Sequence, residues 1–145
     1  YSSSAASDVY KRQVINTVYK GKLMERDYAQ RRGDILRDLD GLRVEVDEKN
    51  RIGYLILDRP PLNIVSFKGR AQIRAIIEAF DEDDDVGVVV IKGANGVFTS
   101  GGDVKRFPDI PKNKMSDLAD NIGAPERCSK PVIAAIEKYA FGVGL

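Results

Sequence analysis

The sequence predicts an α/β protein in which β and α layers are arranged around one sheet. Apolar runs rich in β-branched residues, at 86–91 and 131–136, are typical of buried strands. Residues 66–80 instead carry apolar side chains at helical spacing, which is typical of a helix with one core-facing stripe. Strand and helix patterns that alternate in this way favour mixed β and α layers around one sheet.

Length and composition are those of a soluble globular domain. The chain has 145 residues, of which 43% are hydrophobic and 31% are charged. Its 23 basic and 22 acidic residues leave a net charge of +1, so we expect neither nucleic acid nor a membrane surface as a partner. The single cysteine, Cys128, has no companions for a disulfide or zinc, so we expect a packing role, no metal and a cytoplasmic location. Histidine is absent, which excludes a Ser-His-Asp or Cys-His mechanism within this chain.

The N-terminal 40 residues differ in character from the rest. Residues 3–13 match the in-frame translation of a transposon-based sequencing adapter, so we interpret 1–13 as an artefact and exclude it from the fold. Residues 14–40 are a charged leader, which forms either a surface helix over about 25–39 or a flexible segment. We expect the folded domain to occupy residues 41–145.

The domain is predicted to begin with a β-hairpin. Residues 42–46 alternate between apolar and polar side chains, residues 51–58 form a second apolar run, and Glu48-Lys49-Asn50 supplies the turn between them. Arg59-Pro60-Pro61-Leu62-Asn63 then breaks the second strand, because prolines remove backbone donors. A loop is expected there.

Helices and strands are then predicted to alternate. Ser66 is placed to cap a helix, which the acidic run 81–85 ends as a solvated turn. After the strand at 86–91, a turn at 93–96 reverses the chain. Further along, a helix is expected at 115–122 and a buried strand at 131–136.

Two glycine-rich turns are the strongest functional signal in the chain. One is Ser100-Gly101-Gly102-Asp103 and the other is Gly142-Val143-Gly144, and each follows an apolar run that is typical of a strand. Backbone N–H groups at two such turns can converge on one point, as in an oxyanion hole. Alone, Ser100-Gly101-Gly102-Asp103 is more typical of a plain connection between a strand and a helix.

The order of motifs resembles the crotonase superfamily, which includes the enoyl-CoA hydratases and isomerases. The resemblance covers about 42–145 and implies a crotonase-like ββα spiral, of which this chain is the N-terminal half. The motifs are the hairpin, Arg59-Pro60-Pro61-Leu62-Asn63, the amphipathic helix, Val88-Val89-Val90-Ile91-Lys92-Gly93, Phe98-Thr99-Ser100-Gly101-Gly102-Asp103-Val104, Lys130-Pro131-Val132-Ile133-Ala134-Ala135-Ile136 and Ala140-Phe141-Gly142-Val143-Gly144.

This resemblance implies an acyl-CoA enzyme that stabilises a thioester enolate, with 2-enoyl-CoA hydration as the first expectation. Gly102 and Val143 would supply the two oxyanion N–H groups. Coenzyme A would enter only as part of the substrate, so no separate cofactor is expected. The acyl-CoA contacts that the resemblance implies are Pro60, Leu62, Ile64, Ser100, Asp103, Val104 and Lys105.

Several single residues in these motifs allow more than one role. Ser100 lacks a base that would make it a nucleophile, so hydrogen bonding within the loop is expected of it. Asp103 could be a general base, but a cap for the following helix is favoured. Lys105 is as well explained by a solvated position as by contact with a CoA phosphate. Gly142-Val143-Gly144 lacks the third glycine of a dinucleotide fingerprint, and Tyr139 is expected to pack beside the second turn.

The reaction and the assembly stay open at this point. Isomerisation, hydrolysis and ring-forming or ring-opening chemistry occur in the same family, and a non-catalytic acyl-CoA-binding protein is a further alternative. In hydratases two glutamates beyond the second glycine turn activate the water, so we expect this fragment itself to be inactive. The family usually forms trimers or hexamers, which we expect of the full-length protein.

Overall fold

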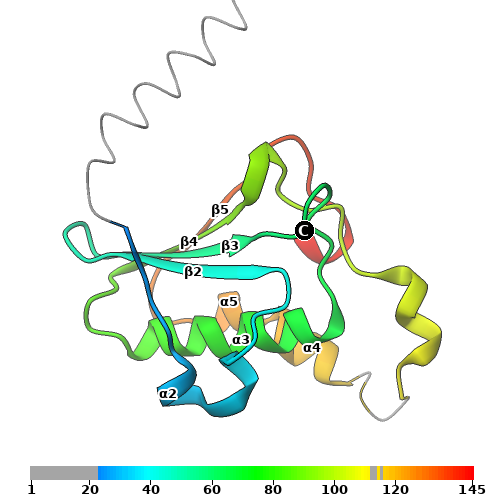
Figure 1. Cartoon of the computed structure of the whole chain (residues 1–145), viewed down its shortest axis with the longest axis horizontal. Coiled ribbons are helices and arrows are strands. Elements are labelled where there is room, and N and C mark those ends of the chain that lie inside the picture. The colour runs from blue at the N-terminus through cyan, green and yellow to red at the C-terminus, as the bar shows by residue number, and fades with distance from the viewer. Residues whose placement is uncertain (1–22, 112–113, 115) are drawn as a thin grey trace, which may run out of the picture.

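The computed structural model describes residues 23–111, 114 and 116–145. The predicted adapter segment at 1–13 and residues 14–22 of the leader lie outside the described residues. A five-stranded sheet, in the order β1-β2-β3-β4-β5, has the α-helices packed on one side (Figure 1). The elements are β1 (Met24–Glu25), α2 (Ala29–Arg32), η1 (Gly33–Leu36), β2 (Leu42–Asp47), β3 (Ile52–Leu57), α3 (Phe67–Glu82), β4 (Val88–Gly93), η2 (Ala94–Gly96), η3 (Val104–Asp109), α4 (Ser116–Ile122), α5 (Ala124–Arg127), β5 (Val132–Ala135) and η5 (Gly142–Gly144).

The sheet contains both antiparallel and parallel strand pairs. Strands β2 and β3 form the expected antiparallel hairpin, with Leu42 opposite Leu57 and Asp47 opposite Ile52. Strands β4 and β5 then add in parallel to β3. Because parallel neighbours need a crossover, α3 connects β3 to β4, and α4 and α5 lie between β4 and β5. The α/β fold class is thereby confirmed.

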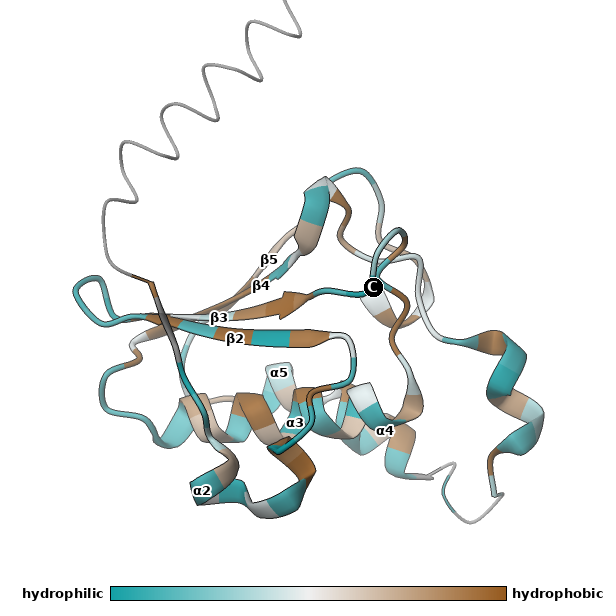
Figure 2. Cartoon of the chain, viewed as in Figure 1, coloured by the Kyte–Doolittle hydropathy of each residue, from teal (hydrophilic) through white to brown (hydrophobic). Residues whose placement is uncertain are grey.

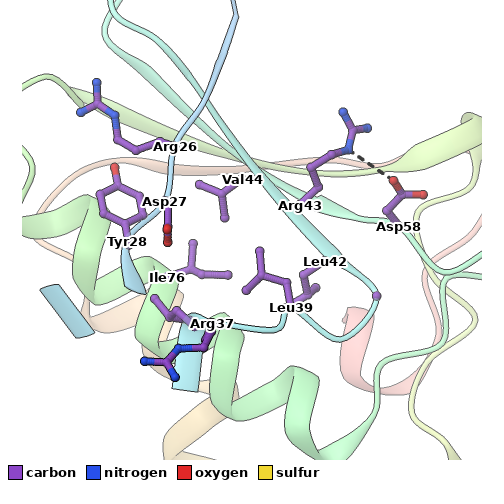
Figure 3. Close-up of a pocket in the computed structure, with 12 residues that line it drawn as sticks. Arg26, Asp27, Tyr28, Arg37, Leu39, Leu42, Arg43, Val44, Asp58 and Ile76 are labelled. Carbon is purple, nitrogen blue, oxygen red and sulfur yellow. Dashed lines mark hydrogen bonds and ion pairs between the residues drawn. The ribbon is translucent and has the colours of Figure 1, made fainter. Parts of the chain in front are cut away.

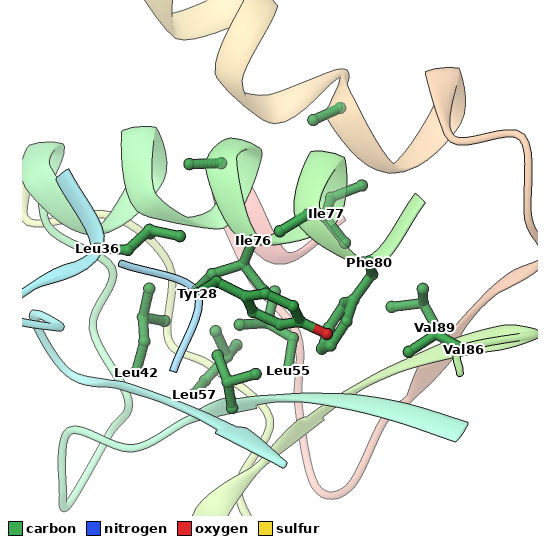
Figure 4. Close-up of a cluster of buried hydrophobic side chains, with 14 of the residues drawn as sticks. Tyr28, Leu36, Leu42, Leu55, Leu57, Ile76, Ile77, Phe80, Val86 and Val89 are labelled. Carbon is green, nitrogen blue, oxygen red and sulfur yellow. The ribbon is translucent and has the colours of Figure 1, made fainter. Parts of the chain in front are cut away.

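Helix α3 forms the centre of the core. Its first turn is capped as predicted, because the Ser66 hydroxyl accepts a hydrogen bond from the Gly69 N–H at 2.9 Å. Its apolar stripe faces the sheet, and apolar residues of both layers meet there (Figure 2). Ile76, Ile77 and Phe80 are buried in this layer with side chains from the strands (Figure 4). The helical periodicity of the sequence therefore identified the buried face correctly.

The continuous helix expected over 25–39 is wrong. The chain instead forms β1, the single turn α2 and the 3₁₀ turn η1. Glu25 pairs with Glu45 of β2, and Gly33, at φ +73°, interrupts the helical path. Tyr28 and Leu36 from this segment are buried in the main core. Pairing with a distant strand overrides the weak local helical spacing.

The two strands predicted to be buried are more open than expected. Strand β4 begins two residues late, at Val88, and Val89 is its only fully buried residue. In β5, Ile133 is 53% exposed, so the prediction of a buried strand at 131–136 is wrong for the described residues. β5 pairs with β4 alone and stands at the edge of the described sheet. An apolar run cannot by itself show how many layers cover it.

The acidic run 81–85 ends α3, but it is not uniformly solvated. Asp83 is 3% exposed, and its Oδ2 accepts hydrogen bonds from the Tyr28 hydroxyl at 2.6 Å and from Arg26 Nη1 at 2.7 Å. Burial alone would raise the pKa of Asp83, but these donors and the Asp85 N–H hold it below its usual value. Both side-chain partners lie more than fifty residues away in sequence, so local pattern could not reveal them.

No helix in the described part of the chain has the length and hydropathy needed to cross a membrane.

Candidate functional site

The loop after the hairpin lies directly against the first glycine turn. The Ser100 N–H donates to the Leu62 carbonyl at 2.9 Å, and the Val65 N–H donates to the Gly101 carbonyl at 2.9 Å. The Asp103 N–H closes the ladder on the Val65 carbonyl at 3.3 Å. Two segments that are some forty residues apart, and that the resemblance assigns to one acyl-CoA site, are thus held side by side.

Two buried polar side chains hold this junction. Asn63 Nδ2 donates to the carbonyls of Ala94 and Val97, at 3.1 and 2.7 Å, and its Oδ1 accepts from the Arg59 N–H at 3.0 Å. The Thr99 hydroxyl donates to the Asn63 carbonyl at 2.6 Å and accepts from the Gly101 N–H at 3.0 Å. These bonds fix the start of the first glycine turn before any ligand arrives.

The second glycine turn packs against the first. Thr99 forms a parallel bridge with Ala140: its N–H donates to Tyr139, and its carbonyl accepts from Phe141, each at 3.3 Å. A Cβ added to Gly101 would meet the Phe141 carbonyl oxygen at 2.8 Å, so only glycine permits this approach. The structure therefore brings the two predicted turns together.

The two expected donor groups are available at this junction. Among the described residues, neither the Gly102 nor the Val143 N–H donates a hydrogen bond to a backbone carbonyl. Val65 hydrogen-bonds to the Gly101 carbonyl and to the Asp103 N–H, which flank Gly102. This pairing directs the Gly102 N–H away from the 60–65 loop. Val143 lies in η5, a single 3₁₀ turn whose first N–H groups have no partner within the turn. Free amide donors at two adjoining turns can receive one negatively charged oxygen.

An apolar cavity of about 510 Å³ opens beside the second turn. Val143 and Gly144 line it together with Phe98 and Thr99 from the first turn. Its one arginine is Arg70, from α3. Concave, largely apolar spaces with few polar groups are where small ligands bind.

The remaining predicted site residues lie around the first turn, mostly at the surface. Pro60 and Leu62 are exposed, Ile64 is half-buried, and Val104 is 67% exposed. Lys105 is exposed on η3, where it can meet a ligand phosphate or solvent. All of them belong to the two segments that meet at the junction between the 60–65 loop and the first turn.

One role expected within this group, the Asp103 cap, is wrong. Asp103 precedes η3, but its side chain makes no capping hydrogen bond; its Oδ2 lies 3.9 Å from Arg106 Nε. Ser100 joins the loop through its backbone, and the neighbouring Thr99 provides the buried hydroxyl bonds. The turn is 3₁₀ rather than α-helical, which leaves the Asp103 carboxylate without the usual cap geometry.

A second cavity, of about 600 Å³, lies at the other end of the sheet between β2 and α3 (Figure 3). Its arginines are already paired: Arg43 Nε contacts Asp58 Oδ2 at 3.3 Å, Arg26 contacts Asp83, and Arg37 contacts Asp34. None of the predicted site residues lines it. We therefore assign the candidate site to the glycine turns. Within the described residues, no group of three His, Cys, Asp or Glu side chains is placed to hold a metal.

Sequence reasoning missed Asn63, Thr99 and Arg70. Asn63 carried one usable signal, since Asn tolerates the positive φ, here +50°, that ends a tight loop. No local pattern marks Thr99 or Arg70 as part of a site. Their roles arise from contacts with segments far along the chain.

Comparison with known proteins agrees with this geometry. The family model for enoyl-CoA hydratase/isomerase matches residues 47–145. A relative named "Probable enoyl-CoA hydratase, mitochondrial" from Dictyostelium discoideum is 34% identical over 101 residues, which are 68% of this chain and 36% of the relative. The "Enoyl-CoA hydratase, mitochondrial" of Pongo abelii is 32% identical over 103 residues, 67% of this chain and 34% of the relative. The chain thus spans about a third of the length of these relatives.

Solved structures share the fold. Pseudomonas aeruginosa DspI superposes with a TM-score of 0.64 at 27% identity, over 77% of this chain and 44% of DspI. An enoyl-CoA hydratase/isomerase from Xanthobacter autotrophicus Py2 gives a TM-score of 0.61 over 69% of this chain and 39% of that one, and at 24% identity it supports the fold alone. The chain belongs to the enoyl-CoA hydratase/isomerase family, within the crotonase superfamily.

Proposed function

We propose that this chain carries the oxyanion-hole turns of an acyl-CoA enzyme, and that the whole protein hydrates a 2-enoyl-CoA. The observation that carries the proposal is the contact between the two glycine turns, with the N–H groups of Gly102 and Val143 free at the junction. The family match and the relatives named enoyl-CoA hydratase support the same reaction.

The proposed reaction depends on stabilising the negative charge that forms on the substrate. Addition of water to the double bond of an enoyl thioester places negative charge on the thioester oxygen. Two fixed N–H donors stabilise that charge more than they stabilise the neutral thioester, and losing one such donor costs about 3 kcal/mol in the transition state. Val143 serves as well as glycine, because the donor belongs to the backbone and the side chain lines the neighbouring cavity.

The acyl-CoA would lie across the junction of the two segments that hydrogen bonds hold together. Its thioester would sit at Gly102 and Val143, and the nucleotide would extend over the exposed residues of the 60–65 loop and of η3. Lys105 is placed there to meet a phosphate as a point charge. Coenzyme A enters as part of the substrate, and the proposal needs no other cofactor.

The proton transfers of the whole protein would use carboxylates, as the resemblance to hydratases implies. The resemblance places the two glutamates of a hydratase after the second glycine turn. We accordingly propose that the 145 residues alone do not turn over substrate. A cytoplasmic location, a role in fatty acid metabolism, and trimeric or hexameric assembly of the whole protein belong to the same proposal.

The test compares Gly102→Pro with Gly102→Ala in the complete protein. Both variants add bulk beside Arg70, but only proline removes the N–H, so their difference isolates the donor. With crotonyl-CoA as the substrate, loss of the conjugated thioester absorbance reports hydration. We expect Gly102→Pro to be about a hundredfold slower than Gly102→Ala, the magnitude for one oxyanion donor. Equal rates in two variants that circular dichroism shows to be folded would refute the donor role.

A further inference from the structure

Arg70 is a buried arginine beside the first glycine turn. It lies in the first half of α3 and is 5% exposed. Its guanidinium carbon is 5.1 Å from the centroid of the Phe67 ring and 5.7 Å from that of Phe107. The two rings are nearly perpendicular, at 82°, and hold the cation through their π faces.

Arg70 forms no ion pair among the described residues, although Glu126 lines the same cavity. No carboxylate of the described chain lies within ion-pairing distance of it, and its Nε has no hydrogen-bond partner. Arg74, one turn further along the same helix, shows the contrast, because its Nε contacts Glu78 Oε1 at 2.8 Å. Burial without a partner lowers the pKa of Arg70. A buried cation whose N–H donors have no partner destabilises the fold, unless a bound ligand supplies the missing hydrogen-bond acceptor.

The Arg70 guanidinium lies beside the proposed thioester site. Arg70 lines the same cavity as Val143 and Gly144. A Cβ on Gly102 would collide with Arg70 Nη2, so the cation rests directly on the residue that carries the first proposed oxyanion donor. An acyl group held by Gly102 and Val143 would therefore begin within reach of the guanidinium.

We propose that Arg70 binds a carboxylate on the acyl group, so that the preferred substrates are short CoA thioesters with a second anionic group a few bonds from the thioester. This inference rests on the proposed acyl-CoA function. A guanidinium presents a planar fork of N–H groups that matches a carboxylate, and contacts with aromatic rings use none of its N–H groups as hydrogen-bond donors. An apolar acyl chain would leave the charge uncompensated in the bound complex.

Calorimetry on the complete protein with succinyl-CoA and butyryl-CoA tests the inference. The two thioesters have the same chain length and differ in the terminal carboxylate. We expect wild type to bind succinyl-CoA at least about tenfold more tightly, the effect of one charged hydrogen-bonded pair. Arg70→Met should abolish that preference and leave butyryl-CoA affinity within about twofold, because it keeps the apolar stem and removes only the charged fork. Arg70→Lys should keep part of the preference, because it retains the charge without the fork.

Arg74→Met is the matched control, since it removes an arginine of the same helix that already has a partner. It should leave the preference unchanged. The inference is overturned if wild type shows no preference, if Arg70→Met retains it, or if Arg70→Met weakens both thioesters equally, which would mark Arg70 as structural. Binding of butyryl-CoA without preference refutes only this inference, whereas failure to bind either thioester refutes the proposed function as well.

Discussion

Replacing Asn63 should destabilise the junction that positions the glycine turns. The side chain is 1% exposed and makes three hydrogen bonds, to the N–H of Arg59 and to the carbonyls of Ala94 and Val97. Each bond contributes about 1 kcal/mol net, so Asn63→Gly should lower the free energy of unfolding by about 3 kcal/mol. Glycine is the informative replacement, because it accepts the positive φ of +50° without strain.

Asn63→Ala adds the strain of a Cβ at positive φ to the lost hydrogen bonds. That strain costs about 1 kcal/mol more, so alanine should be the worse of the two variants. Asn95 provides a matched control, because it also has a positive φ, +57°, but is exposed. Asn95→Ala should therefore show only the strain, of about 1 kcal/mol.

Urea denaturation of the complete protein, followed by circular dichroism, measures all three variants. At constant m-value, the midpoints convert directly into differences in unfolding free energy. A loss below about 0.5 kcal/mol in Asn63→Gly would refute the assigned hydrogen bonds. Equal losses in the glycine and alanine variants would refute the conformational part of the reasoning.

Two further predictions concern buried contacts. Tyr28→Phe removes a donor to Asp83 and should cost about 1–2 kcal/mol. The pKa of Asp83 is lowered in the fold. The full destabilisation by Tyr28→Phe should therefore be seen above the unfolded carboxyl pKa of about 3.9, and it should diminish as the pH falls toward the folded pKa. Urea titrations repeated between pH 7 and 3 measure this change in the free energy of unfolding. Gly144→Ala places a methyl group against Thr99 Cγ2 and should cost about 1–3 kcal/mol. Thr99→Ser, which keeps the hydroxyl and removes that methyl, should restore most of the loss; a strictly additive double-mutant cycle would contradict the proposed contact.

Local patterns predicted the regular elements well where one face dominates the energetics. The Ser66 cap, the stripe of α3 and the alternation of β2 all appear in the structure, because each depends on residues close in sequence. The same reasoning failed for 25–39, where two residues pair with β2 and Tyr28 enters the core. It also failed for β5, because apolar composition shows a tendency to be buried but not which layer covers the strand.

The candidate site, too, was predicted only in part from local sequence. The sequence by itself determined the two glycine turns. At Gly101 an added Cβ would meet the Phe141 carbonyl oxygen at 2.8 Å, and at Gly142 the φ of +54° favours a residue without a Cβ. Only the tertiary structure decided that the turns meet, that Asn63 and Thr99 brace them, and that Arg70 lies unpaired over Gly102. Those contacts join segments some thirty to forty residues apart, and they exist only after the sheet has brought the ends of its strands to one edge.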